Sequence, residues 1–369
     1  MSEQSSSTRL HPETDVLTRG FDPRLSVGSA RPAVFRSSTY VFSSPEEAER
    51  AFQVMSGRAK LGAGETTDLI YSRFNHPNAE ILEQQIIPLE PKAKAAAVFN
   101  SGMAAIMTAL LAVVRPGDSV LFTVPVYGAT QTLIADFLKD FGVAPIPVAA
   151  GRTEEIASAV HSAKNLRVVL IETPANPTIV MTDIRSACEA ARNKADTAER
   201  PLVMVDNTFL GPAFQHPLAL GADATLYSAT KYLGGYSDII GGVALTRDAG
   251  LMQRIRAKRS LFGNILQPDE CWILNTRLPT VALRMNRQSK SAQRIAEALA
   301  HHPNVEKVYY PTLFEDPSQK RIFESQCDFP GGIISIDIRG GKPAAFHFLR
   351  RLRIARNAVS LGGVETLVC

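Results

Sequence analysis

The stretch Tyr227-Ser-Ala-Thr-Lys-Tyr-Leu-Gly-Gly-Tyr-Ser-Asp238 holds the feature around which the rest of the chain can be organised. It places Lys231 directly after Thr230 and three residues after Ser228. A lysine amine can condense with a carbonyl to form a Schiff base, and neighbouring hydroxyls are good ligands for a phosphate group. The chain has 40 lysines and arginines, however, and a lysine taken alone is usually a solvated surface residue. The partners of Lys231 must therefore come from other parts of the sequence.

Length and composition favour a small-molecule enzyme. The 369 residues, 45% of them hydrophobic, can form one large core and a smaller one, so two domains are expected. A formal net charge of +4, without a run of five like charges, gives no sign of a nucleic-acid or anionic-membrane surface. The four cysteines lack the paired spacing of a disulfide framework or a zinc site, so free thiols and no metal are expected; they are Cys188, Cys271, Cys327 and Cys369.

The sequence predicts a cytoplasmic protein without a membrane segment. Residues 1–15 are polar and cannot be a secretory signal. Residues 95–114 contain no charge, but Asn100-Ser101-Gly102 divides them into a short strand and a helix. Each of these is shorter than the roughly 20 residues that a bilayer-spanning helix needs.

Alternating strand-like and helical patterns predict a mostly parallel sheet with helices on both faces. Because ligands of such sheets bind beyond the carboxyl ends of the strands, polar residues at those ends are the candidates for a site. The predicted strands are 95–99, 119–124, 168–171, 202–205, 225–227 and 242–245, and the predicted helices lie near 101–113, 129–141, 183–194 and 249–260.

The pattern changes on either side of this region. Residues 1–60 are polar and interrupted by prolines, with a helix predicted only at 45–55, and are expected to form an arm that packs on another subunit. After about residue 262, a smaller α+β unit is predicted from a long helix at 268–300 broken at Pro279, strands at 305–309 and 332–336, and a helix at 343–352. The expected division is therefore an arm at 1–60, a cofactor-binding domain at 61–262 and a C-terminal domain at 263–369.

Polar residues stand at four of the predicted strand ends. Ser101-Gly102 opens a helix, where backbone N–H groups can bind phosphate. Asp206 ends a buried strand, where a carboxylate can pair with a protonated pyridine nitrogen. Tyr127 and Asn176 follow two further strands and could contact a planar ring. Each residue alone could equally be a helix cap, a turn former or a core aromatic. Together with Lys231 they describe a site for pyridoxal phosphate (PLP).

In this order the residues resemble the Cys/Met-metabolism family of PLP-dependent enzymes. This family includes cystathionine γ-synthase, cystathionine γ- and β-lyases, methionine γ-lyase and the O-acylhomoserine sulfhydrylases. The resemblance covers about residues 30–369 and is strongest in Ser-Ala-Thr-Lys-Tyr at 228–232, Val-Asp-Asn-Thr at 205–208 and Pro-Ala-Asn-Pro-Thr at 174–178.

The resemblance implies PLP fold type I, the aspartate-aminotransferase-like α/β fold, with a mostly parallel sheet, flanking helices and a smaller C-terminal α+β domain. Members of the family continue for several tens of residues beyond the position of Cys369, and that continuation includes an arginine that binds the substrate carboxylate. The C-terminal domain of this chain is therefore expected to be incomplete.

The resemblance also implies a role for each matching residue. Lys231 would form the Schiff base, and Tyr127 would stack on the ring and act as an acid, so both would be catalytic. Asp206 would pair with the pyridine nitrogen. Asn176 would contact the cofactor's phenolic oxygen or the substrate, and Ser360 would be a second substrate contact. The remaining cofactor ligands, at the phosphate, would be Ser101, Gly102, Met103, Ser228 and Thr230.

The segment Ile70-Tyr-Ser-Arg-Phe-Asn-His-Pro-Asn78 resembles the family's Tyr-Ser-Arg-x-x-Asn-Pro-Thr segment. In the family, the residues that match Tyr71 and Arg73 bind the phosphate of the neighbouring subunit. The resemblance therefore implies a homo-oligomer with shared active sites, either a dimer or a homotetramer. This chain departs from the pattern, because His76 stands directly before the proline and Asn78 replaces the threonine.

The resemblance implies a PLP-dependent enzyme of methionine and cysteine metabolism, including transsulfuration, whose small-molecule substrate is a sulfur amino acid or an O-acylhomoserine. We expect a carbon–sulfur lyase that performs γ-elimination. The alternatives are a γ-replacement transferase, which joins an O-acylhomoserine to cysteine, and a non-catalytic PLP-binding homologue. Ala129 replaces a cysteine of typical methionine γ-lyases and Val359 a glutamate of cystathionine γ-lyases, so the substrate stays open. A Rossmann-type nucleotide site is disfavoured, because Asn-Ser-Gly-Met after the first strand lacks the glycine fingerprint.

Overall fold

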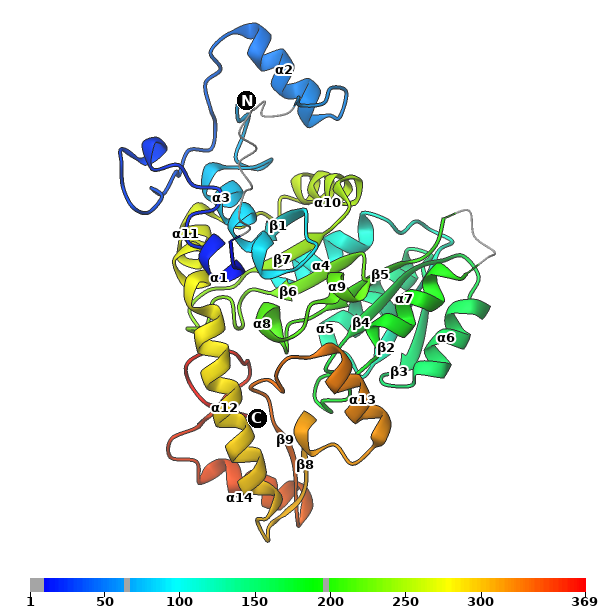
Figure 1. Ribbon diagram of the computed structural model, residues 1–369. Helices are drawn as coiled ribbons and strands as arrows, with labels where there is room; N and C mark the ends of the chain where they lie inside the picture. Colours follow the sequence, from blue (N-terminus) through cyan, green and yellow to red (C-terminus); the bar gives the residue numbers. More distant parts are fainter. Residues whose placement is uncertain (1–9, 63–66, 195–198) are drawn as a thin grey trace, which may run out of the picture.

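A seven-stranded sheet forms the centre of the computed structural model, which describes residues 10–62, 67–194 and 199–369 (Figure 1). The strand order is β1-β7-β6-β5-β4-β2-β3. Neighbouring strands are parallel except for β7, which runs antiparallel to both β1 and β6, so the predicted mostly parallel sheet is confirmed. The bounds are β1 Ala95–Phe99, β2 Ser119–Val124, β3 Ala144–Ala149, β4 Leu166–Glu172, β5 Leu202–Asp206, β6 Ala224–Ser228 and β7 Gly242–Thr246.

Strand β3 was not predicted, because Pro145 and Pro147 interrupt its sequence. A proline lacks the N–H group that a central strand would donate to its neighbour. The structure places β3 at the edge of the sheet, paired only with β2, where one side of the strand needs no donors. The tertiary position therefore permits a strand that the local sequence disfavours.

Two hydrophobic cores lie on the two faces of the sheet, because successive strand side chains point to opposite sides. In β1, Ala96 and Val98 belong to one core, and Ala97 and Phe99 to the other. The first core is closed by α3 Pro77–Ile86, α6 Thr153–Ser162, α7 Ile184–Arg192 and α11 Pro268–Arg277. The second is closed by α4 Gly102–Leu111, a π-helical segment Leu133–Leu138 that continues α5 Gly128–Thr132, and α10 Ala249–Phe262. The long runs of buried strand residues reflect this double cover.

The C-terminal part follows the predicted order of elements. Helix α11 is separated by a 3-10 turn at Leu278–Thr280 from α12 Val281–Ala300, as Pro279 predicted. Strand β8 Val305–Tyr309 pairs antiparallel with β9 Ser335–Ile338, which begins three residues later than expected. Helix α14 Gly341–Arg350 matches the helix predicted at 343–352. Helix α13 Pro317–Gln326 between β8 and β9, and the short parallel pair β10 Arg356–Asn357 and β11 Leu367–Val368, were not predicted. In Figure 1, α12 extends from the sheet-bearing region to β8, β9 and α14.

The N-terminal segment packs on the first core through Val16, which is buried there, whereas its helix at 45–55 projects away from the sheet in Figure 1. It contains α1 Pro12–Asp15, a 3-10 turn at Pro23–Ser26 and α2 Pro45–Met55, which matches the predicted helix at 45–55. Ser44 caps α2 by accepting a hydrogen bond from the Glu47 amide. The arm is fastened to α11 by the Trp272 indole, which donates to the Pro32 carbonyl at 2.9 Å. The first nine residues, which the sequence placed in the arm, lie outside the described residues.

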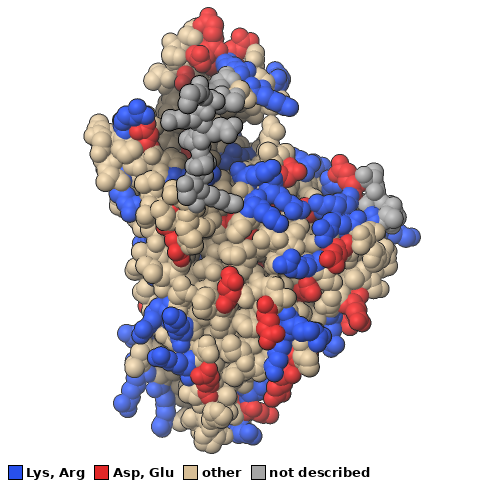
Figure 2. All heavy atoms as spheres, viewed as in Figure 1, with Lys and Arg blue, Asp and Glu red and all other residues tan. Residues whose placement is uncertain are grey.

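Charged side chains are unevenly distributed over one face of the molecule (Figure 2). On the face in Figure 2, lysine and arginine side chains gather over α10 and its surroundings, whereas both signs are interspersed elsewhere. Within the described ranges, no helix is both long and apolar enough to cross a membrane, and no three His, Cys, Asp or Glu side chains group as metal ligands.

Glu90 is a buried carboxylate that makes folding stability depend on pH. It accepts hydrogen bonds from the Tyr227 hydroxyl at 2.8 Å and the Leu218 amide at 3.0 Å, and burial raises its pKa to about 8. The folded protein thus keeps a proton on Glu90 that the unfolded chain releases at lower pH. The free energy of unfolding therefore falls as the pH rises from the ordinary glutamate pKa of 4.5 to about 8. We expect Glu90→Gln to reduce the loss of unfolding free energy between pH 5.5 and 8.5, measured by urea denaturation. An unchanged pH dependence in the variant would contradict this assignment.

Candidate active site

The carboxyl ends of β1, β6, β5 and β4 meet at one edge of the sheet and place the predicted residues there. Asp206 at the end of β5 pairs in register with Glu172 at the end of β4, and Ser228 at the end of β6 pairs with Gly242. Gly242 also pairs with Phe99 at the end of β1. The structure therefore brings together residues that are far apart in the sequence.

The start of α4 lies directly against the end of β6. Ser101 caps the helix, because its hydroxyl accepts a hydrogen bond from the Ala104 amide at 3.0 Å. A Cβ on Gly102 would lie 2.8 Å from the Ser228 Cβ and 3.0 Å from the Ser228 Cα, so only glycine permits this approach. The amides of Gly102 and Met103, as the first two of the helix, have no intrahelical acceptor. This arrangement is suited to binding an anion.

Asp206 is held by Thr208, a residue that the sequence analysis did not single out. The Thr208 hydroxyl and amide donate to the Asp206 Oδ1 atom at 2.6 Å and 3.1 Å. The same hydroxyl accepts a hydrogen bond from the Ser228 amide at 2.9 Å. Burial raises the pKa of Asp206, and the hydrogen bonds from Thr208 act in the opposite direction. Thr208 thus connects the carboxylate at the end of β5 to the loop that carries Lys231.

Lys231 contacts a residue from the C-terminal part of the chain. Its Nζ atom donates to the Ser360 Oγ at 2.8 Å, across 129 residues of sequence, and burial lowers the pKa of the lysine. The backbone of Gly362 packs against the same loop, because a Cβ there would lie 2.6 Å from the Tyr232 amide nitrogen. Thr230, next to the lysine, fixes the loop by accepting from the Gly241 amide at 3.0 Å.

Glu172 connects Tyr127 and Asn176, and it is the second residue that the sequence analysis missed. Its Oε2 atom accepts from the Tyr127 amide and its Oε1 atom from the Asn176 amide, both at 2.9 Å. Burial, followed by the charge of Asp206, raises the pKa of Glu172 to about 8. The Tyr127 side chain is half-exposed at this edge. An apolar strand that ends in a carboxylate is the same signal that identified Asp206.

Tyr71 and Arg73 line a cavity whose walls do not include Lys231. Its volume is about 410 Å³, and its other walls include Arg36, His76 and Gln267. The Arg73 Nη1 atom donates to the Ser260 carbonyl at 2.6 Å, and its guanidinium lies over the Phe74 ring. Tyr71 also forms an antiparallel β-bridge with Thr39 of the N-terminal segment. These contacts of Tyr71 and Arg73 are therefore with α10, the N-terminal segment and their own segment.

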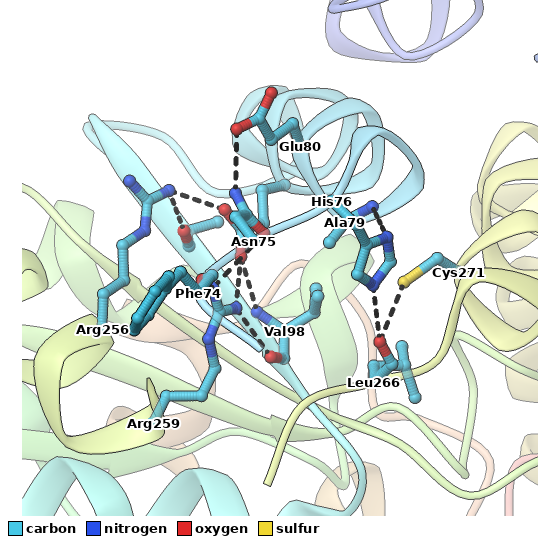
Figure 3. Close-up of polar contacts among 12 residues, drawn as sticks. Phe74, Asn75, His76, Ala79, Glu80, Val98, Arg256, Arg259, Leu266 and Cys271 are labelled. Carbon is cyan, nitrogen blue, oxygen red and sulfur yellow. Dashed lines mark hydrogen bonds and ion pairs between the residues drawn. The ribbon is translucent and has the colours of Figure 1, made fainter. Parts of the chain in front are cut away.

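The departure from the family pattern at His76 and Asn78 has a structural explanation, and Figure 3 shows the contacts of His76. His76 caps α3 through Nδ1, which accepts from the Ala79 amide at 3.2 Å, so the proton lies on Nε2, which donates to the Leu266 carbonyl at 2.9 Å. The Asn78 side chain bonds to the backbone of Ala33 and Phe35. Both residues fasten the segment that carries Tyr71 and Arg73.

Solved structures of the same fold identify the class of enzyme to which this chain belongs. The methionine gamma lyase of Micromonospora echinospora superposes with a TM-score of 0.83 at 34% identity, covering 96% of this chain and 88% of that chain. The predicted PLP fold type I is confirmed by this likeness together with the sheet topology.

The family follows from sequence comparison. The model of the family described as Cys/Met metabolism PLP-dependent enzyme matches residues 13–369. The L-methionine gamma-lyase of Pseudomonas deceptionensis is 36% identical over 356 residues, or 96% of this chain and 84% of that protein. The cystathionine gamma-synthase of Mycobacterium bovis is 34% identical over 357 residues, or 97% and 85%. The chain therefore belongs to the Cys/Met-metabolism family of PLP-dependent enzymes, and its cofactor is PLP.

Proposed function

We propose that this chain catalyses γ-elimination on a sulfur amino acid and releases a thiol, a 2-oxo acid and ammonia. The observation that carries the proposal is the surroundings of Lys231, which lies three residues after the end of β6. Burial lowers the pKa of this lysine, and its amine contacts Ser360. The lyases and the synthase to which the chain is similar support carbon–sulfur chemistry.

The residues at the sheet edge fit PLP. We assign the phosphate to the start of α4 and the hydroxyls near it, because helix amides, close-packed Gly102 and nearby hydroxyls are suited to an anion. The buried Asp206 accepts hydrogen bonds from neutral Thr208, and a protonated ring nitrogen would supply the missing positive charge. The complete set assigned to the phosphate is Ser101, Gly102, Met103, Ser228 and Thr230.

The chain's own residues would then position the substrate and move protons. PLP, when bound, supplies an electron-withdrawing ring that stabilises negative charge on substrate carbons. Lys231 would hold the cofactor and afterwards transfer protons between neighbouring substrate carbons, and its lowered pKa favours the neutral amine that a base requires. Tyr127 would protonate the leaving group, and Asn176 and Ser360 would contact the substrate.

We also infer a cytoplasmic homotetramer in which Tyr71 and Arg73 complete the partner's phosphate site. Support comes from their position beside a cavity away from Lys231 and from the exposed apolar residues of the arm, such as Val41 and Phe52. Such residues are typical of a surface that another subunit covers. The division into an arm at 1–60, a cofactor-binding domain at 61–262 and a C-terminal domain at 263–369 is part of the same proposal.

The test of function uses the PLP-loaded protein with L-methionine, L-cystathionine and O-acylhomoserines, with 2-oxo acid and thiol as the measured products. Formation of both from methionine or cystathionine supports γ-elimination. Cystathionine formed from an O-acylhomoserine and cysteine, without elimination, would assign γ-replacement instead. A bound cofactor without either product would indicate a non-catalytic homologue.

Gly102→Ala is expected to weaken PLP binding. The new methyl group would overlap Ser228 and push the start of α4 away from β6, which separates the two halves of the proposed phosphate site. We expect Kd for PLP to rise by roughly tenfold or more, equivalent to about 1.4 kcal/mol. Fluorescence titration of the cofactor-free protein measures this Kd. Gly128→Ala is the control, because a Cβ at Gly128 would meet no atom within 4 Å; equal Kd values in the two variants would contradict the assignment.

A further inference from the structure

We propose that Glu172 is a positioning residue, which fixes Tyr127 and Asn176 beside Asp206 by accepting hydrogen bonds from both of their backbone amides. The inference rests on the function proposed above and adds a residue to that site. Its role differs from that of the other site residues, because it acts through the position of two neighbours and not through contact with the substrate.

Each of the two side-chain oxygens of Glu172 accepts a hydrogen bond from a different loop. The loop after β2 presents the Tyr127 amide to Oε2, and the loop after β4 presents the Asn176 amide to Oε1, both at 2.9 Å. The backbone of Glu172 is itself fixed, because its amide donates to the Thr123 hydroxyl at 3.2 Å. A single buried side chain thus sets the distance between two loops that otherwise follow different strands.

A carboxyl group offers this pair of acceptors, because both of its oxygens keep a lone pair whether or not the group is protonated. Both partners are N–H donors, so each requires an oxygen. A glutamine at the same place would offer one oxygen and one NH₂ group, and the NH₂ group would face a second donor. An aspartate would keep both oxygens but lacks a methylene group, so it would not reach both loops. The side-chain chemistry at Glu172 therefore matches the two amides.

The position of Glu172 is unfavourable for a residue that serves packing alone. It is buried and lies in register with Asp206, so a second carboxylate stands beside the first. Burial and this neighbouring charge both oppose ionisation of Glu172. An apolar side chain would fill the same space without the cost of burying a carboxyl group next to a second one. Strongly perturbed carboxylates of this kind cluster at functional sites.

The test compares wild-type protein with Glu172→Gln by hydrogen exchange and by kinetics. In the cofactor-free protein, we expect faster exchange in the segment 124–130, in the segment 174–180, or in both, because at least one amide loses its acceptor. In the PLP-loaded enzyme we expect kcat to fall by roughly tenfold or more, since small displacements of positioned groups slow catalysis steeply. Glu90→Gln is the matched control, because Glu90 is also buried with a pKa of about 8 but contacts Tyr227 and Leu218.

A third comparison separates positioning from general damage. If Glu172 acts through Tyr127, the double variant with Tyr127→Phe will lose less kcat/KM than the product of the two single losses. Unchanged exchange in both segments, or fully multiplicative losses, would overturn the proposal. If Glu172→Gln does not fold, Glu172→Asp is measured in the same way, with the same two outcomes. Hydrogen exchange requires no turnover, so it tests the role of Glu172 even if the proposed elimination is not found.

Discussion

Lys231→Ala is expected to lower turnover by roughly a thousandfold, within the range of 10²–10⁴ that a positioned acid–base group contributes. The loop that carries Lys231 is fixed by the hydrogen bond between Thr230 and Gly241, and its amine is held at Ser360, so we expect no other lysine to replace it. The measurements are product formation and the visible absorption of the PLP-loaded protein.

The variant should also lose the lysine-linked cofactor band and the covalent label that borohydride reduction leaves on the peptide containing Lys231. Lys290→Ala on α12 serves as the control, since that lysine is exposed and on a different element. Full turnover by Lys231→Ala, or a label that stays on the protein, would remove this lysine from the mechanism.

Arg259→Leu is expected to have the largest effect on stability. The Arg259 Nη1 atom lies 2.6 Å from the Glu83 Oε1 atom, and both side chains are only 2% exposed. Burial raises the pKa of Glu83, but Arg256 and Arg259 together lower it by more, so the carboxylate is charged. Removing one partner of a buried pair typically costs about 3–5 kcal/mol. Glu83 would keep its ion pair with the less buried Arg256 at 2.7 Å, so we expect a loss toward the lower end of this range.

Urea denaturation of Arg259→Leu and of Arg254→Leu measures this loss. Arg254 lies on the same helix but is exposed, so its replacement should change the unfolding free energy by less than about 0.5 kcal/mol. Equal stability of the two variants would show that the Glu83–Arg259 pair contributes little. Arg259 also donates to the Phe74 carbonyl at 3.1 Å, so its loss should loosen the segment that carries Tyr71 and Arg73.

The location of most candidate residues could be predicted because the signals are local. An apolar strand that ends in Asp206, and a strand that turns into a helix at Ser101-Gly102, are visible within a few residues. Parallel strands bring their carboxyl ends to one edge, so local signals at several strand ends predict a shared site. The structure places these residues at that edge.

The role of Glu172 was missed, although it ends an apolar strand as Asp206 does, because its partners carry no sequence signature. The contact of Thr208 with the Ser228 amide was missed for the same reason. Glu172 accepts from backbone amides that belong to residues 45 and 4 positions away. Any residue except proline supplies such an amide, so the contact cannot be inferred from residue types. The buried pair of Glu83 and Arg259 was missed for a related reason, because 176 residues separate the two charges.

The sequence by itself determined the α/β fold, the family, and the lysine, carboxylate and helix start that fit PLP, since periodicity and short motifs depend on neighbouring residues. The tertiary structure alone decided that β3 can contain prolines at an edge, that Ser360 meets Lys231, and that Glu172 holds Tyr127 and Asn176 together. These features depend on contacts between distant segments, and their geometry arises only when the sheet assembles.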